Sequence, residues 1–161
     1  MRAHFEMKRI LKWGIPALVI LFAGLQFVHP SRTNPPVKSD FLKATGAPPD
    51  VAAMFHAACY DCHSDETRWP WYSRVAPMSW QVAQDVIDGR RHVNLSEWPD
   101  NPDLARKKIE NMSDEIDDSD MPLKKYTLIH RDARLTAEQR DTLTQWLDAQ
   151  ASALKSKGDK Q

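Results

Sequence analysis

The segment Cys59-Tyr60-Asp61-Cys62-His63 constrains this chain more than any other feature, because it contains both cysteines of the 161-residue sequence. Two cysteines three positions apart can form a redox disulfide, contribute to a zinc site, or attach a haem group covalently. Each possibility requires different surroundings in the rest of the chain. The remaining sequence therefore has to decide among the three.

The first two possibilities are disfavoured. A thioredoxin-type C-x-x-C motif follows a β-strand, whereas no alternating stretch in this chain is long enough to predict a strand. A structural zinc ion needs four ligands, and Cys59, Cys62 and His63 supply at most three of them. The other histidines are scattered without the spacing of a zinc-binding pair.

Covalent haem attachment explains the spacing of these residues. C-x-x-C-H is the pattern of c-type haem attachment. Two thiols about one helical turn apart can bond the two vinyl groups of one porphyrin, and the next histidine can bind the iron as its proximal ligand. We therefore predict one haem c attached through Cys59 and Cys62, with iron bound by His63.

Residues 1–29 have the pattern of a secretory signal or a signal anchor. Basic residues dominate positions 1–12, and the 16 residues at positions 13–28 carry no charge. This uncharged run is shorter than the roughly 20 residues that span a bilayer comfortably. A small-x-small cleavage site is missing, which favours an uncleaved transmembrane anchor. We expect the domain on the periplasmic side of the bacterial inner membrane, or in the periplasm if the segment is cleaved.

Three further parts follow this segment. The proline-rich stretch 30–46 is predicted to be an extended tether. Residues 47–150 form the predicted haem-binding domain, and residues 151–161 a flexible tail. The formal net charge of the chain is zero, so we expect no nucleic-acid-binding surface.

Helical patterns predict an all-α domain of about four helices around the haem, preceded by an N-terminal hydrophobic helix. The first helix of the domain begins at Pro49-Asp50 and runs into Cys59. The second begins at Ser79 and is stopped by Gly89.

The last two predicted helices have clear start signals. The third starts near Asn101-Pro102 and ends early in the acidic run 114–120, because acids are unfavourable at a helix C-terminus. The fourth starts with a capping box formed by Thr136 and Gln139. Its buried stripe is predicted to contain Leu143, Trp146 and Leu147.

The ligand on the far side of the iron decides what such a haem can do. Met121 is the preferred candidate, because Pro122 favours an extended backbone that can hold the thioether out from a loop. Met78 is the second choice, and Met112 lies on an apolar helix face, where methionine usually serves packing. The remaining alternatives are an open position or one of the histidines His56, His92 and His130.

The segments CYDCHS, WPWYSRVAPMSW, DGRRHVNLSEW and MPLKKYTLIHRDARLTAEQRDTLTQW together resemble the bacterial haem-binding domain family, which comprises small exported proteins similar to c-type cytochromes. The resemblance extends from about Gln26 to Trp146. It implies a cytochrome-c-like helical fold with covalent haem at Cys59 and Cys62. The Met-Pro motif of the family falls on Met121-Pro122.

Three residues of an aromatic segment are further candidates for haem contacts. Trp69 and Tyr72 could pack along the haem edge, and the tyrosine hydroxyl or Arg74 could bind a haem propionate. The alternative is a rigid aromatic loop with solvated arginines.

Ligation by methionine and histidine raises the reduction potential and shields the iron from small substrates. We therefore predict a monohaem electron-transfer cytochrome that meets redox partner proteins and is not an enzyme. The alternatives are a peroxidase-type enzyme and a haem-based sensor, each with an open or exchangeable sixth ligand. The acidic run 114–120 could dock a basic partner, although a solvated turn is the favoured interpretation.

Overall fold

The computed structural model describes residues 2–158, with side chains from residue 11 to residue 156. Regular structure in this range is helical, apart from one isolated bridge between Ser39 and Glu97. The predicted all-α fold is confirmed. The chain divides into two compact units: a first unit of Met1–Arg32 with Trp69–Asp85, and a second unit of Thr33–Arg68 with Val86–Gln161.

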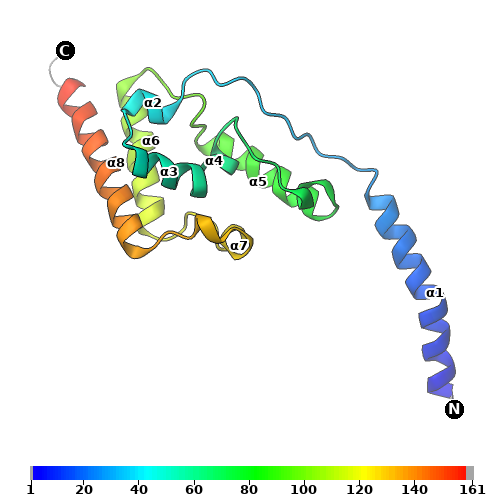
Figure 1. Ribbon diagram of the computed structural model, residues 1–161. Coiled ribbons are helices and arrows are strands. Elements are labelled where there is room, and N and C mark those ends of the chain that lie inside the picture. The colour runs from blue at the N-terminus through cyan, green and yellow to red at the C-terminus, as the bar shows by residue number, and fades with distance from the viewer. Residues whose placement is uncertain (1, 159–161) are drawn as a thin grey trace. The chain divides into compact units, whose positions relative to one another are not determined.

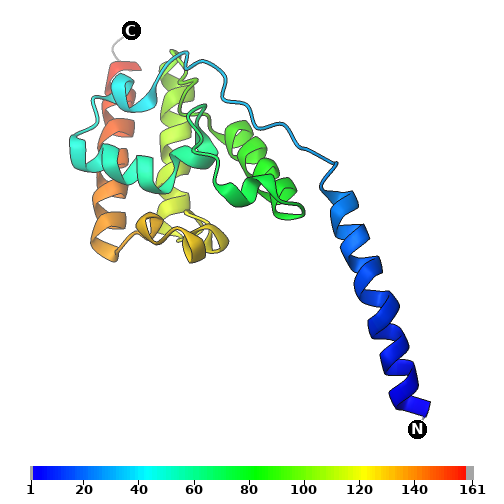
Figure 2. The ribbon, with the colours of Figure 1, turned by 45° about the vertical axis from the view of Figure 1, so that its right-hand side comes forward.

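The helices are labelled in Figure 1, and the same colours recur in Figure 2. In chain order they are α1 (Arg2–Leu25), α2 (Phe41–Thr45), α3 (Pro49–Ala58), α4 (Tyr60–His63), η1 (Trp71–Arg74), α5 (Met78–His92), α6 (Pro102–Asp117), α7 (Lys124–Ile129), η2 (Arg131–Ala133) and α8 (Ala137–Gly158). The labels η1 and η2 mark 3-10 helices. Helix α5 contributes residues to both units.

Helices α6 and α8 form the framework of the second unit, where they lie side by side and run in opposite directions (Figure 2). Ile109 and Ile116 of α6 and Leu143 and Leu147 of α8 are buried in the hydrophobic core. The predicted stripe of α8 is thus correct for its two leucines, and Trp146 packs against the same core. Burial of such aliphatic side chains is the main stabilising contribution to a small helical domain.

An aromatic cluster joins α2 and α3 to this framework. The ring of Phe41 lies 5.2 Å from that of Phe55, 4.5 Å from that of Trp98 and 5.8 Å from that of Trp146, measured between centroids. Residues 41–46, which the sequence placed in the extended tether, therefore include a helix whose first residue is fully buried. An apolar pair, Phe41-Leu42, can be removed from water only by folding onto the core.

Several predicted helix boundaries are confirmed by the caps. Helix α3 begins at Pro49, and α6 begins after Asn101, whose side chain accepts a hydrogen bond from the Leu104 amide. The capping box of α8 is formed in both directions: Gln139 Oε1 accepts from the Thr136 amide at 2.9 Å, and Thr136 Oγ1 accepts from the Gln139 amide at 3.2 Å.

Three predicted helix ends are wrong, and in each case tertiary packing overrides the local signal. Helix α5 continues through Gly89 to His92. Helix α6 continues into the acidic run as far as Asp117, because Ile116 is buried in the core. Helix α8 continues to Gly158 through the predicted flexible tail, because Leu154 packs against the core. Residues 159–161 of that tail lie outside the described residues.

Helix α1 of the first unit exposes its apolar side chains. Five consecutive residues, from Leu18 to Phe22, are each between 49% and 72% exposed. No helix among the described residues combines the length and the apolar character that a membrane crossing requires. The membrane anchor stays a prediction from the sequence.

Candidate functional site

The C-x-x-C-H motif forms a single helical turn in the second unit. Cys59 lies between α3 and α4, and its amide donates to the Phe55 carbonyl at 2.9 Å. The Cys59 carbonyl accepts from the amides of Cys62, at 3.2 Å, and His63, at 2.9 Å. These bonds hold the two half-buried thiols one turn apart, and no disulfide joins them. The predicted spacing of two attachment points is thus present in the backbone.

The Cys59 thiol has the electrostatic surroundings of an unreactive cysteine. Burial raises the pKa of this thiol to about 12, and the neighbouring Cys62 adds to the increase. Catalytic thiols of disulfide oxidoreductases have a lowered pKa, because the thiolate is the attacking species. The raised pKa therefore argues against a redox dithiol.

The His63 ring is held by the backbone through one of its two nitrogens. Its Nδ1 lies 3.2 Å from the Val93 carbonyl oxygen. A carbonyl oxygen only accepts hydrogen bonds, so Nδ1 carries the proton and Nε2 keeps its lone pair. Burial lowers the pKa of His63, although hydrogen bonds to the carbonyls of Val93 and Gly89 oppose this effect. A neutral imidazole held through Nδ1 is the usual arrangement of a metal-ligating histidine.

Helix α5 packs directly against the motif at Gly89. A Cβ atom at this position would lie 2.6 Å from the Cys62 carbonyl oxygen and 3.2 Å from the Cys62 Cβ. Only a glycine permits this approach without displacement of the helix or the motif. Gly89 therefore serves close packing and does not end the helix.

Asp61, in the middle of the motif, links it to two other segments. Its Oδ1 accepts from the Arg68 amide at 3.0 Å and from Arg68 Nε at 3.2 Å. Its Oδ2 accepts from the Tyr126 hydroxyl, on α7, at 2.8 Å. The motif and α7 are thus joined by a hydrogen bond across 65 positions of sequence.

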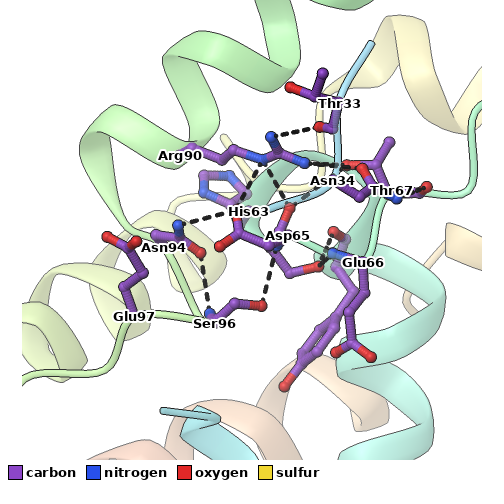
Figure 3. Close-up of polar contacts among 12 residues, drawn as sticks. Thr33, Asn34, His63, Asp65, Glu66, Thr67, Arg90, Asn94, Ser96 and Glu97 are labelled. Carbon is purple, nitrogen blue, oxygen red and sulfur yellow. Dashed lines mark hydrogen bonds and ion pairs between the residues drawn. The ribbon is translucent and has the colours of Figure 1, made fainter. Parts of the chain in front are cut away.

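Arg90 of α5 fixes the chain that leaves the motif (Figure 3). Its Nε donates to the Ser64 carbonyl at 2.8 Å, and its Nη2 donates to Thr67 Oγ1 at 3.0 Å. The guanidinium also lies 3.4 Å from Asp65 Oδ1 in an ion pair that is largely shielded from solvent. The planar fork of arginine suits several simultaneous acceptors of this kind.

The same guanidinium binds the segment that precedes α2. Its Nη1 donates to the Thr33 carbonyl at 3.0 Å, and its Nη2 donates to Asn34 Oδ1 at 3.1 Å. Asp65 is held in addition by Asn94 Nδ2, at 3.2 Å. Its Oδ2 is the one buried side-chain oxygen or nitrogen among the described residues that lacks a hydrogen-bond partner. Arg90 thus supplies a positive charge next to this buried carboxylate.

Met121 lies in the loop between α6 and α7 of the second unit, and its side chain is half-buried. Its amide donates to the Glu115 carbonyl at 3.0 Å, and its carbonyl accepts from Arg140 Nη1 at 2.9 Å. Its backbone is therefore held between α6 and α8. The loop position and the fixed backbone agree with the prediction that this methionine is presented from a loop.

The other candidates for the sixth ligand have different surroundings. Met112 packs against the hydrophobic core, as predicted for a packing residue. Met78 begins α5 and belongs to the first unit. His130 stacks on Tyr126 with ring centroids 4.2 Å apart, and the His56 ring lies 4.2 Å from that of Tyr60. His92 is the last residue of α5.

Trp69, Tyr72 and Arg74 belong to the first unit, whereas the C-x-x-C-H motif and Met121 belong to the second. Their predicted contacts with a haem edge or propionate stay predictions. The sequence did not single out the roles of Asp61, Arg90 and Tyr126, and it singled out Gly89 only as a helix end. For Tyr126 no local signal exists, because its partner lies far away in the sequence.

No group of three or more histidine, cysteine, aspartate or glutamate side chains among the described residues is arranged to hold a metal ion.

Comparison with known proteins agrees with this geometry. Residues 20–149 match the model of the haem-binding domain family. Neither the search of curated proteins nor the search of solved structures finds a match. The match includes the complete C-x-x-C-H motif, Gly89, Arg90 and Met121. The chain therefore belongs to the haem-binding domain family.

Proposed function

We propose that this haem-binding protein is a monohaem c-type cytochrome that transfers electrons on the outer side of the cytoplasmic membrane. In this proposal Cys59 and Cys62 hold the porphyrin covalently, while His63 and Met121 bind the iron on its two sides. The haem supplies a one-electron iron couple. A single haem is proposed because the sequence contains a single C-x-x-C-H motif.

The observation that carries the proposal is the state of His63 next to the two thiols. Its Nδ1 is occupied by the Val93 carbonyl, so that Nε2 is the nitrogen left for iron. The thiols one turn apart and the neutral ring match the donor set of a c-type site. The hydrogen bond from the Leu95 amide to the His63 carbonyl, at 2.7 Å, fixes the backbone of this ligand as well.

Electron transfer is proposed over catalysis because both candidate ligands are held firmly. The Met121 backbone is bonded to α6 and to Arg140 of α8, and Tyr126 ties the following helix to Asp61. A ligand with a fixed backbone keeps its position when the iron changes charge, which suits an electron carrier. An exchangeable ligand, as in a sensor or peroxidase, requires a loop that moves readily.

Membrane attachment through α1 is part of the proposal. The five consecutive exposed residues from Leu18 to Phe22 cover all sides of the helix, because each turn contains 3.6 residues. A helix that is apolar on all sides needs apolar surroundings on all sides. Lipid supplies such surroundings, and covalent haem attachment outside the cytoplasm accords with a periplasmic location.

Haem staining and absorption spectra test the ligand set. The full chain is expressed together with a cytochrome c maturation system, and we expect the haem to remain with the polypeptide on a denaturing gel. The Cys59→Ser/Cys62→Ser variant should lose this stain. The oxidised wild-type protein should be low-spin and show the long-wavelength sulfur-to-iron band, and voltammetry should show one reversible one-electron wave.

A pair of methionine variants identifies the sixth ligand. Met121→Leu should lose the sulfur-to-iron band, whereas Met112→Leu, a change of similar volume in the core, should keep it. High-spin iron in the wild type, or a band that persists in Met121→Leu, would overturn the assignment of Met121. A protein without covalent haem would overturn the proposal as a whole.

A further inference from the structure

The segment 69–80 of the first unit, called the aromatic loop here, is bonded to the chain just after α1. The side chain of Gln26 pairs with the backbone of Ala76 in both directions: its Oε1 accepts from the Ala76 amide at 2.9 Å, and its Nε2 donates to the Ala76 carbonyl at 3.3 Å. Ala76 is buried. The side-chain amide of Gln26 therefore satisfies both the backbone N–H and the backbone C=O of Ala76, as a paired segment of backbone would.

Two more side chains strengthen this attachment. Trp80 Nε1 donates to the Val28 carbonyl at 2.9 Å, and Arg32 Nη1 donates to the Ser73 carbonyl at 2.6 Å. The three attachments join residues 26–32 to residues 73–80. The aromatic loop is therefore held beside the C-terminal end of α1.

The aromatic loop exposes large apolar side chains on this side of the unit. Trp71 is 77% exposed, Met78 is 43% exposed and Val75 is 36% exposed. Phe27, in the segment to which the loop is attached, is 84% exposed. Several large exposed apolar side chains in one small unit favour a surface that another apolar phase covers, and tryptophan in particular is enriched where membrane meets water.

The charges of this region suit a lipid surface as well. The segments 26–34 and 69–84 contain no aspartate or glutamate, whereas they contain Arg32 and Arg74. Arg74 lies in η1 together with Trp71, and its side chain is exposed. Arginine binds phosphate groups bidentately, and anionic lipids attract such a basic surface.

We propose that the aromatic loop is a second membrane-contacting element beside α1. Trp71 lies at the level of the lipid headgroups, Val75 and Met78 face the acyl chains, and Arg74 binds lipid phosphate in place of the haem propionate that the sequence suggested for it. The proposal rests on the membrane attachment of α1 proposed above. It adds a contact that depends on Gln26, Trp80 and Arg32, and that fixes how the end of α1 meets the bilayer surface.

Photolabelling from within the bilayer tests this contact. The full-length holoprotein is reconstituted into vesicles of phosphatidylcholine and phosphatidylglycerol that contain a lipid-soluble diazirine, and labelled residues are located by mass spectrometry. We expect label in residues 11–28 and in the aromatic loop at Trp71, Val75 or Met78. Leu104 of the second unit, which is 48% exposed, is the reference for labelling from solution and should stay unlabelled.

The labelling pattern distinguishes failure of the second contact from failure of the membrane attachment of α1. Label in residues 11–28 without label in the aromatic loop overturns the second contact alone, and indicates that a protein partner or solvent covers the loop. Absence of label from both regions overturns the membrane attachment of α1 and the second contact with it. Equal label in Leu104 and in the loop also counts against the second contact.

A pair of glutamine variants tests the attachment itself. Gln26→Ala removes both bonds to Ala76, so that the equilibrium constant for seating the aromatic loop beside α1 should fall about fivefold, as expected from the loss of roughly one net hydrogen bond, and label in the loop should fall relative to label in α1. Gln81→Ala, which removes only an exposed bond to Asp85, should leave the ratio unchanged. An unchanged ratio in Gln26→Ala overturns the role of Gln26 in positioning the loop.

Discussion

The hydroxyl of Tyr126 donates a hydrogen bond of 2.8 Å to Asp61 Oδ2, and thereby joins α7 to the middle of the C-x-x-C-H motif. Tyr60, the neighbouring residue of the motif, takes part in a similar bond: its hydroxyl donates to Asp40 Oδ2 at 2.8 Å and joins α4 to the residue that caps α2. The two pairs match in chemistry and in length. The pairs differ in the helix that each one holds. The Tyr126 bond holds α7, which follows the Met121 loop, whereas the Tyr60 bond holds α2, which does not.

Tyr126→Phe should weaken the hold on the Met121 loop. We expect the free energy of unfolding to fall by about 1.5–3 kcal/mol, the usual contribution of a hydrogen bond to a charged group. We also expect imidazole to bind the oxidised haem about fivefold more tightly, because displacing Met121 then requires less disruption. Imidazole titration followed by absorption measures the second effect.

Tyr60→Phe is the matched control for this prediction. It should lower the free energy of unfolding by a similar amount, about 1.5–3 kcal/mol, while the imidazole affinity stays at the wild-type value. An equal rise in imidazole affinity in both variants would mean that general destabilisation, and not the Asp61–Tyr126 bond, opens the iron.

Gly89→Ala should push α5 away from the motif. The added Cβ would lie 2.6 Å from the Cys62 carbonyl oxygen, which is backbone and cannot yield without moving the motif. We expect a loss of about 1–3 kcal/mol in the free energy of unfolding and a lower yield of covalent haem. Urea unfolding and haem staining measure the two effects.

Gly24→Ala provides the comparison, because a Cβ at Gly24 meets nothing within 4 Å. An alanine in a helix is ordinarily more stable than glycine by about 1 kcal/mol. Gly24→Ala should therefore leave haem attachment unchanged. Normal stability and haem yield in Gly89→Ala would show that the close approach is not required.

Arg90→Gln should destabilise the chain much more than Arg91→Gln does. Arg90 compensates the buried carboxylate of Asp65, and removing one partner of a buried pair costs about 3–5 kcal/mol. Arg91 forms an exposed ion pair with Asp88, worth about 0.2–1 kcal/mol. Urea unfolding of both variants measures the difference, and equal losses would contradict the assigned role of Arg90.

Stability should fall at high pH because of Tyr60. Burial, reinforced by the hydrogen bond to Asp40, raises the pKa of Tyr60 above its ordinary value of 10.0. The unfolded chain therefore releases this proton at lower pH than the folded chain does. The contribution to stability is complete below about pH 10 and is lost as the pH rises above it. Urea unfolding at increasing pH should show a shallower decline for Tyr60→Phe than for the wild type.

The features that depend on neighbours along the chain could be predicted from the sequence. The C-x-x-C-H spacing implied one helical turn, and the capping box of Thr136 and Gln139 and the Asn101 cap implied where two helices begin. Each of these interactions closes within a few residues, so its geometry follows from the backbone of one turn. The all-α class followed from the same local periodicity.

The distant groups that meet the motif could not be predicted in this way, because helix packing selects them. Gly89 carried the local signal of a helix end, yet its lack of a side chain serves the approach of α5 to Cys62. Arg90 and Tyr126 carried no distinguishing local signal, because their partners depend on how α5 and α7 pack. Long-range packing is selected by the burial of whole helix faces, and no single local pattern encodes which surfaces come together.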